Sequence, residues 1–338
     1  GVPDDFAAIS GNALAQHFDN ESITLTHNLV LPNDINAAAG SLTTETANNF
    51  VNSTVDNQYT YSEVGIIDLL ANLSDGNYLG ASDGGGTGGN IQGRVFNVGR
   101  FTPDHFELTI TQDGTLDVVC NIADTTEPAQ PFAYNAQMES SSVVKGALQY
   151  DILPELLITA KSSLCSGSVC STTSNYSGDF IKLTAADVLK YQVNDGSGLF
   201  VDFPISDASQ NGLDGINKVR LTATYSAGTL TEGPGKGELI FNYSTDDHFA
   251  YLHEKNAEVS PFTADINLSI ASIIDSDLIA ANDIDADPDL LGPILNSDTV
   301  VTFNPVGKEI RFGRALLENS FGPETANLPQ PFYIQYLS

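Results

Sequence analysis

Hydrophobic and polar residues alternate along much of this chain with the period of two that is typical of β-strands. Short runs rich in valine, isoleucine, threonine, tyrosine and phenylalanine end at glycine, asparagine, aspartate or proline, which are turn residues. These runs predict strands at residues 22–31, 59–69, 105–110, 115–120, 219–225, 238–243, 299–303, 309–317 and 331–336. Helical periodicity is scarce, with short helices expected only within 4–18 and 184–190. The pattern therefore predicts an all-β fold with little helix.

Two turn signals predict which of these strands pair. Asp113-Gly114 separates the third strand from the fourth and predicts a hairpin between them. The glycine-rich segment 233–237 separates the fifth strand from the sixth and predicts a second pair. Strands at this spacing are typical of Ig-like β-sandwich modules. We therefore predict two or three such modules in series.

Two breaks in the pattern predict where the modules meet. Five of the seven residues at 83–89 are glycine, and 207–215 contains Asn-Gly and Asp-Gly pairs. These breaks predict an N-terminal module at residues 1–98, a middle module at 99–205 and a C-terminal module at 206–338.

A Gly-Arg pair between apolar residues occurs twice, within 98–106 and within 310–319. Glycine permits close approach of two backbones, and arginine pairs with carboxylates, which this chain has in excess. We interpret both segments as connections between β-sheets rather than as parts of an active site.

Composition narrows the function. The chain has 338 residues, 41% of them hydrophobic, which is enough for two or three buried cores. Its formal net charge of −30 repels nucleic acid and anionic membrane surfaces. No apolar run reaches the roughly 18 residues that a membrane-spanning helix needs. The chain begins Gly1-Val2-Pro3, without methionine or a leader, which we interpret as a mature or excised product.

The cysteines predict one disulfide. Cys165 and Cys170 enclose the flexible segment Ser-Gly-Ser-Val, and two thiols alone make an incomplete zinc site. A disulfide between them closes a small loop and places the chain in an oxidising compartment. Cys120 is left over, either buried as a small hydrophobic residue or paired outside this chain.

One acidic cluster is a candidate metal site. Its members are Asp275, Asp277, Asp283, Asp285, Asp287 and Asp289. Ca²⁺ takes six to eight oxygen ligands, so several of these carboxylates are candidate calcium ligands, although the spacing is not that of an EF-hand. The alternative is a solvated acidic loop. The sequence contains no nucleophile elbow, catalytic Cys-His arrangement or phosphate-binding loop, so we predict that the protein is not an enzyme.

Several short sequence segments resemble those of a known family, and they occur in the same order along the chain. They lie at 61–65, 77–80, 98–106, 130–134, 157–161, 175–183, 261–262, 275–277, 311–324 and 328–332. Together they resemble the domain of unknown function of MshQ-like proteins, named for biogenesis of a type IV pilus. The resemblance implies an exported surface or pilus protein and supplies no catalytic residues. This chain differs in lacking a lectin-like N-terminal domain and in ending at Ser338, where relatives are expected to continue.

The combined prediction is a non-enzymatic extracellular protein of a Gram-negative bacterium, acting as a pilus-associated adhesin or adhesin stalk. Its expected partners are other surface or pilus proteins, copies of itself or glycans, but not nucleic acid. No cofactor is expected apart from the candidate calcium ion. One alternative is a structural subunit of a filament assembled by β-strand exchange. A second alternative is a secreted carbohydrate-active protein.

Overall fold

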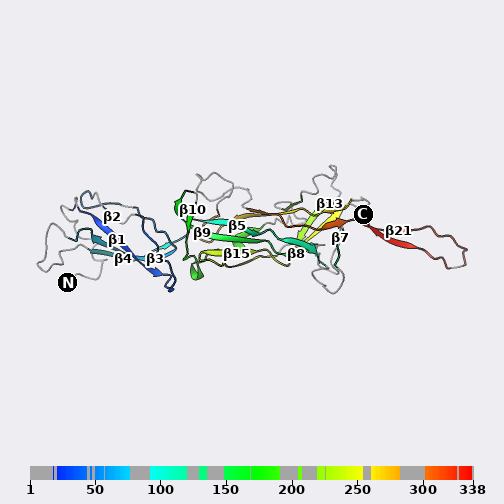
Figure 1. Cartoon of the computed structure of the whole chain (residues 1–338), viewed down its shortest axis with the longest axis horizontal. Helices are drawn as coiled ribbons and strands as arrows, with labels where there is room; N and C mark the ends of the chain where they lie inside the picture. Colours follow the sequence, from blue (N-terminus) through cyan, green and yellow to red (C-terminus); the bar gives the residue numbers. More distant parts are fainter. Residues whose placement is uncertain are drawn as a thin grey trace. The chain divides into compact units, whose positions relative to one another are not determined.

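β-Strands dominate the computed structural model of the chain shown in Figure 1. The structure describes residues 18, 21–43, 46–47, 50–56, 58–76, 92–119, 129–134, 148–167, 169–190, 205–207, 219–224, 226–253, 260–281, 301–325 and 327–336. The chain groups into two compact units. Unit 1 comprises residues 1–106, 159–182 and 233–238, and unit 2 comprises 107–158, 183–232 and 239–338.

The prediction of an all-β chain with little helix is confirmed. Within the described residues, helix is confined to short stretches such as the 3₁₀ turns η3 (Gly178–Phe180) and η4 (Ala185–Asp187). Of the two predicted helices, 184–190 contains η4 and then strand β11 (Val188–Lys190), whereas 4–18 lies outside the described residues apart from Phe18. No described helix is long and apolar enough to cross a membrane. The Ig-like strand order stays a prediction.

Unit 1 contains a four-stranded antiparallel sheet of order β2-β1-β3-β4. Its strands are β1 (Ile23–Leu31), β2 (Thr46–Ala47), β3 (Gly65–Leu73) and β4 (Gln92–Phe101). The alternation in β1 faces Leu25 and Leu29 towards a core built on Leu42, Tyr61 and Ile67. Burial of these apolar side chains is the main force that holds the sheet in this place.

Strand β3 begins later than its sequence predicts. The predicted run started at Tyr59, but the strand starts at Gly65. Tyr61 instead forms an isolated antiparallel bridge with Leu42. Its ring is buried and lies 5.0 Å from that of Phe101, and its hydroxyl donates to the Ala39 carbonyl over 2.6 Å. The first part of the alternating run therefore pairs with another segment instead of extending β3.

A five-stranded sheet has the order β10-β9-β15-β14, with β5 also paired with β9. Its strands are β5 (His105–Gln112), β9 (Glu155–Ser166), β10 (Val169–Thr172), β14 (Thr229–Glu232) and β15 (Glu238–Asn242).

Unit 2 contains four further sheets, of order β13-β16-β8-β6, β11-β18-β12 with β19 on β18, β17-β20-β7, and β21-β22. Their strands, in addition to β11, are β6 (Thr115–Val118), β7 (Phe132–Tyr134), β8 (Leu148–Ile152), β12 (Ile205–Asp207), β13 (Val219–Thr224), β16 (His248–His253), β17 (Phe262–Thr263), β18 (Ile266–Ile273), β19 (Val301–Phe303), β20 (Glu309–Arg311), β21 (Gly313–Leu317) and β22 (Phe332–Tyr336).

A connected group of aromatic rings fills the core of unit 2. The Tyr150 ring lies 5.5 Å from that of Phe249 and 6.1 Å from that of Tyr243. The Tyr243 ring in turn lies 5.8 Å from Phe241 and 5.4 Å from Phe303. All five residues are buried and meet edge to face, an arrangement that adds to the energy of burial alone. This cluster joins residues of four strands, and burial of the tyrosine ring raises the pKa of Tyr243.

The predicted hairpin at Asp113-Gly114 is wrong. Strands β5 and β6 belong to different sheets, since β5 pairs with β9 and β6 with β8. The turn is held by another segment: Asn304 N donates to Asp113 Oδ1 over 3.1 Å and Val306 N donates to the Gly114 carbonyl over 3.1 Å. Gly114 has φ of +90° and would place a Cβ 2.9 Å from the Ile152 carbonyl, so the turn requires glycine. The chain therefore passes from one sheet to another here.

The second predicted pair is also wrong. Strand β13 pairs with β16, and β15 pairs with β14, a strand that the sequence pattern missed. The glycine-rich segment 233–237 joins β14 to β15 in a hairpin with Thr229 opposite Asn242. The short connection between β14 and β15 costs less loop-closure entropy than the longer connection between β13 and β15 that the predicted pairing requires.

The predicted module boundaries near residues 98 and 206 fall inside β4 and β12, and the three-module division stays a prediction. The glycine-rich segment 83–89 and Cys120 lie outside the described residues.

Candidate functional site

Asp275 is the best-defined member of the predicted acidic cluster, and its role is structural. It is buried just after β18, and its Oδ1 accepts hydrogen bonds from Asp277 N over 2.9 Å and Ile279 N over 3.0 Å. Such side-chain acceptors fix tight turns. The half-buried Asp277 follows in the same turn, whereas Asp283, Asp285, Asp287 and Asp289 lie outside the described residues. Within the described part of the chain, no group of three histidine, cysteine or acidic residues is placed to hold a metal.

We expect the midpoint of thermal unfolding to be the same with calcium and with a chelator, because Asp275 serves a backbone turn that needs no cation. A ligand that binds only the folded chain must raise the midpoint. Differential scanning calorimetry of the full chain in Ca²⁺ and in EDTA makes the measurement. A higher midpoint in Ca²⁺ that is lost on replacing Asp283 and Asp285 with asparagine would instead establish the calcium site.

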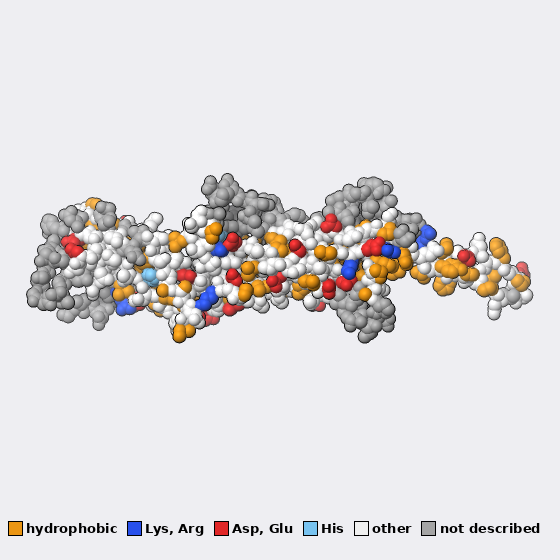
Figure 2. All heavy atoms as spheres, in the orientation of Figure 1, with side chains coloured by type: hydrophobic (Ala, Val, Ile, Leu, Met, Phe, Trp, Pro, Cys, Tyr) orange, Lys and Arg blue, Asp and Glu red, His pale blue; other side chains and the backbone are white. Residues whose placement is uncertain are grey.

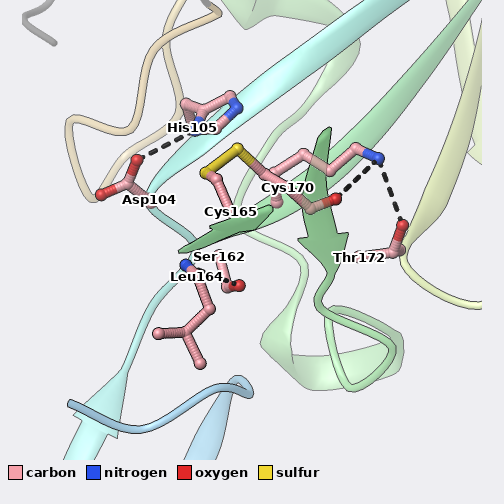
Figure 3. Close-up of a disulfide and its surroundings, with 8 residues drawn as sticks. Asp104, His105, Ser162, Leu164, Cys165, Cys170 and Thr172 are labelled. Carbon is pink, nitrogen blue, oxygen red and sulfur yellow. Dashed lines mark hydrogen bonds and ion pairs between the residues drawn. A yellow bond between two sulfur atoms is a disulfide. The ribbon is translucent and has the colours of Figure 1, made fainter. Parts of the chain in front are cut away.

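The predicted disulfide is present in the structure, with a bond of 2.01 Å between Cys165 and Cys170 (Figure 3). The two cysteines are register partners at the end of the β9-β10 hairpin. Gly167, with φ of +66°, lies in the turn between them. The disulfide thus fastens the end of this hairpin.

Polar groups around the disulfide hold the neighbouring backbone in place (Figure 3). Lys161 Nζ donates to the Cys170 carbonyl and to Thr172 Oγ1, each over 3.4 Å. His105 Nδ1 lies 2.9 Å from Asp104 Oδ2, and Asp104 N donates to the Lys161 carbonyl over 2.8 Å. These contacts tie β10 and the start of β5 to β9 and give the surroundings of the disulfide a structural role.

We expect replacement of both Cys165 and Cys170 with serine to lower the free energy of unfolding by about 2 kcal/mol, because the bond closes a short loop in the unfolded chain. Equilibrium denaturation monitored by circular dichroism measures this loss. In a parallel test, the denatured, unreduced chain is alkylated, and mass spectrometry should show Cys165 and Cys170 without the alkyl group. Alkylation of both thiols before reduction would show that no such bond forms.

A buried polar cluster in unit 1 was not predicted from the sequence. Glu63 is only 7% exposed, and its carboxylate accepts hydrogen bonds from Ser174 N over 3.1 Å and Asn175 N over 3.0 Å. Asn175 Nδ2 donates to the carbonyls of Ala38 over 2.8 Å and Val64 over 3.0 Å, while its Oδ1 accepts from Ala38 N over 2.8 Å. One buried asparagine and one buried glutamate thus connect three segments that are distant in sequence.

Burial shifts the pKa of Glu63. Loss of hydration raises the pKa of this carboxyl, although the backbone N–H donors of Asn175, Ser174 and Val64 and the charge of Lys236 oppose the shift. The pKa of Asp68, also in unit 1, shifts in the opposite direction: the hydrogen bond from Arg94 over 2.8 Å, together with that from the Asn97 amide, lowers it. Asp68 belongs to β3 and Arg94 to β4, so this pair links neighbouring strands of unit 1.

The first Gly-Arg pair lies in β4, and its glycine permits the close backbone approach that the sequence predicted. Gly99 has φ of +114° and would place a Cβ 2.9 Å from Phe101 N and 3.0 Å from the Gly65 carbonyl. A side chain at this position would strain the pairing of β3 with β4.

The second Gly-Arg pair opens β21, which forms with β22 the most exposed apolar element of the described chain. All residues of β21 and β22 are exposed, and hydrophobic side chains gather along this hairpin in Figure 2. Phe332 is 67% exposed, Ile334 71%, and Phe321 in the connecting loop 91%. Exposed apolar surface of this kind marks interaction sites. The sequence predicted one strand at 309–317, which the structure divides into β20 and β21, and another at 331–336, where β22 lies. The exposure of the hairpin is a tertiary property that periodicity does not indicate.

Comparison with known protein families gives a match over most of the chain. The model of a protein family described as DUF6701, third domain, matches residues 63–294. No curated protein and no solved structure matches the chain. The matched range includes Glu63 and Asn175, whereas the β21-β22 hairpin lies beyond it.

Proposed function

Because the chain belongs to the family described as DUF6701, third domain, we propose that it is a non-enzymatic β-sheet part of an exported surface protein. Its function would be that of a type IV pilus-associated adhesin or adhesin stalk of the MshQ-like kind. The observation that carries the proposal is the Cys165–Cys170 disulfide in an all-β chain whose family is described as one domain of a series. Disulfides persist in oxidising, extracytoplasmic compartments, and serial β-domains are common in cell-surface proteins.

The physical properties of the chain suit a stalk. The net charge of −30 favours solubility and disfavours unspecific adhesion to acidic surfaces. Specific attachment would then depend on loops, sheet edges or neighbouring domains, with glycans or other surface proteins as partners.

Exchange of the whole chain in the source bacterium tests this function. Sheets pair across the limits of the matched range, since β1 pairs with β3 and β20 pairs with β7. Residues 1–338 are therefore replaced as one piece by unrelated tandem β-sandwich domains of similar length, and surface display is followed with an antibody on intact cells. A stalk predicts that the protein remains on the surface and that adhesion is retained. Loss of adhesion with normal display would instead place the binding site within these residues. Absence of the native protein from the surface would overturn the proposal.

Two further measurements separate the alternatives. Electron microscopy of native material distinguishes isolated rods at pilus tips from polymers, which a filament subunit would form. A glycan-hydrolysis screen with the purified chain tests the carbohydrate-active alternative, and turnover that depends on one carboxylate would establish it.

A further inference from the structure

The β21-β22 hairpin has one face without charge. Strand register pairs Gly313 with Tyr336, Ala315 with Ile334 and Leu317 with Phe332. Side chains alternate between the two faces of a sheet, so these six residues share one face. Arg314 and Gln335 are register partners, and both lie on the opposite face. We call the face formed by 313, 315, 317, 332, 334 and 336 the apolar face.

The base of this hairpin is anchored in unit 2. The Arg311 guanidinium lies 4.4 Å from the ring centre of Phe132 and 4.9 Å from that of Tyr336, and the two rings are 5.0 Å apart. Arg311 also forms an ion pair with Glu309 over 3.0 Å. The hairpin is therefore fixed where it leaves β20, and its outer part extends away from the other sheets of unit 2 (Figure 1), with hydrophobic side chains along its surface (Figure 2).

A two-stranded hairpin is marginally stable in water unless something covers its apolar face. Among the described residues, β21 and β22 pair only with each other. From the apolar face, Leu317, Phe332, Ile334 and Tyr336 are between 48% and 71% exposed. An aromatic side chain buries roughly 150–250 Å² when fully covered and an aliphatic one somewhat less, so covering the exposed parts of these four would remove about 500 Å² from water in each copy. Two copies reach about 1,000 Å², the lower limit of a specific interface.

We propose that the apolar face packs against the same face of a second copy of this chain, forming a reversible two-fold dimer. Beyond its base, where Arg311 lies over Tyr336, the face is apolar, so an identical face is a chemically matched partner. Two faces with no charge also meet without placing carboxylates of two strongly acidic chains against each other. The resulting four strands in two layers form a small sandwich with its own core. A two-fold contact closes on itself, so it yields dimers rather than filaments. This inference does not depend on the proposed adhesive function.

Sedimentation velocity of the full chain, from low to high micromolar concentration, tests the dimer. We expect a concentration-dependent shift from monomer to dimer that strengthens with added NaCl, because salt screens repulsion between two chains of charge −30. Ile334→Lys places two ammonium groups in the interface and should weaken dimerisation at least about tenfold, a change of about 1.4 kcal/mol. Ile35→Lys is the matched control, since Ile35 is 98% exposed in unit 1, and it should leave the dimer unchanged.

A cross-linking experiment protects the test against misfolding of the lysine variant. In a Cys120→Ser background, Ile334→Cys should form disulfide-linked dimers, whereas Gln335→Cys on the opposite face should not. A chain that stays monomeric at every concentration and salt level would overturn the proposal and leave a different β-sheet partner as the occupant. Equal cross-linking at both positions, or dimers unaffected by Ile334→Lys, would also overturn it.

Discussion

Replacement of Phe249 with alanine is expected to lower the free energy of unfolding of unit 2 by about 3–5 kcal/mol. Phe249 is fully buried in β16, and its ring meets that of Tyr150 at 5.5 Å. The substitution removes an aromatic ring from the group that joins β8, β15 and β19, and the closely packed neighbours cannot fill the cavity. Urea denaturation monitored by tyrosine fluorescence measures the loss, since the chain contains no tryptophan.

Phe321→Ala is the matched control for this prediction. The residue type and the substitution are the same, but Phe321 is 91% exposed, so the expected change is within about 0.5 kcal/mol. Similar losses for both variants would mean that the aromatic group does not form the core of unit 2. Because the chain contains two compact units, the unfolding transition should be assigned with probes in each unit.

Strand content was predictable from this sequence because alternation is a local property. Residues 22–31 alternate, and β1 occupies almost the same range. Pairing was not predictable, because it depends on partners that are distant in sequence. Asp113-Gly114 has the composition of a hairpin turn, yet hydrogen bonds from 304–306 direct the chain into another sheet. A turn signal fixes a change of direction but does not choose the next partner strand.

Several of the segments on which the resemblance rests contact one another in the structure. Glu63 in the segment 61–65 accepts a hydrogen bond from Asn175 in the segment 175–183. Arg311 in the segment 311–324 lies over the ring of Phe132 in the segment 130–134. The members of each pair are distant in sequence but lie in the same unit, so they make tertiary contacts that maintain the fold. The buried Glu63–Asn175 contact could not be derived from one sequence, since an acidic residue is usually exposed.

The candidate site divides in the same way. Spacing alone predicted the Cys165–Cys170 bond, since the loop between the two cysteines is short and flexible. The acidic residues were predicted as a set, but Asp275 is occupied with the turn that follows β18. The uncovered face of β21-β22 required coordinates, because an apolar strand in the sequence gives no sign of whether anything packs on it.

The protonation of Glu63 gives the polar cluster a defined pH dependence. Since burial raises the pKa of Glu63 above its ordinary value of 4.5, the folded chain binds this proton more tightly than the unfolded chain. The resulting stability is fully present below pH 4.5 and is lost as the pH rises through the folded-state pKa. Glu63→Gln should remove this contribution, so the free energy of unfolding should fall less between acidic and neutral pH than in the unchanged chain.

Asn175→Ala is expected to destabilise unit 1 by about 2–4 kcal/mol, because it removes three side-chain hydrogen bonds and leaves the buried Val64 carbonyl without this donor. Asn175→Asp should cost more at neutral pH, since it loses both Nδ2 bonds and places a second carboxylate beside Glu63. Lowering the pH protonates one of the two acids, so the gap between the aspartate and alanine variants should narrow. Asn28→Ala, at an exposed position of β1, is the control and should change stability by no more than about 0.5 kcal/mol. Chemical denaturation from pH 4 to pH 8 makes these measurements. If the aspartate and alanine variants differed by the same amount across this range, Asn175 and Glu63 would not be coupled through charge.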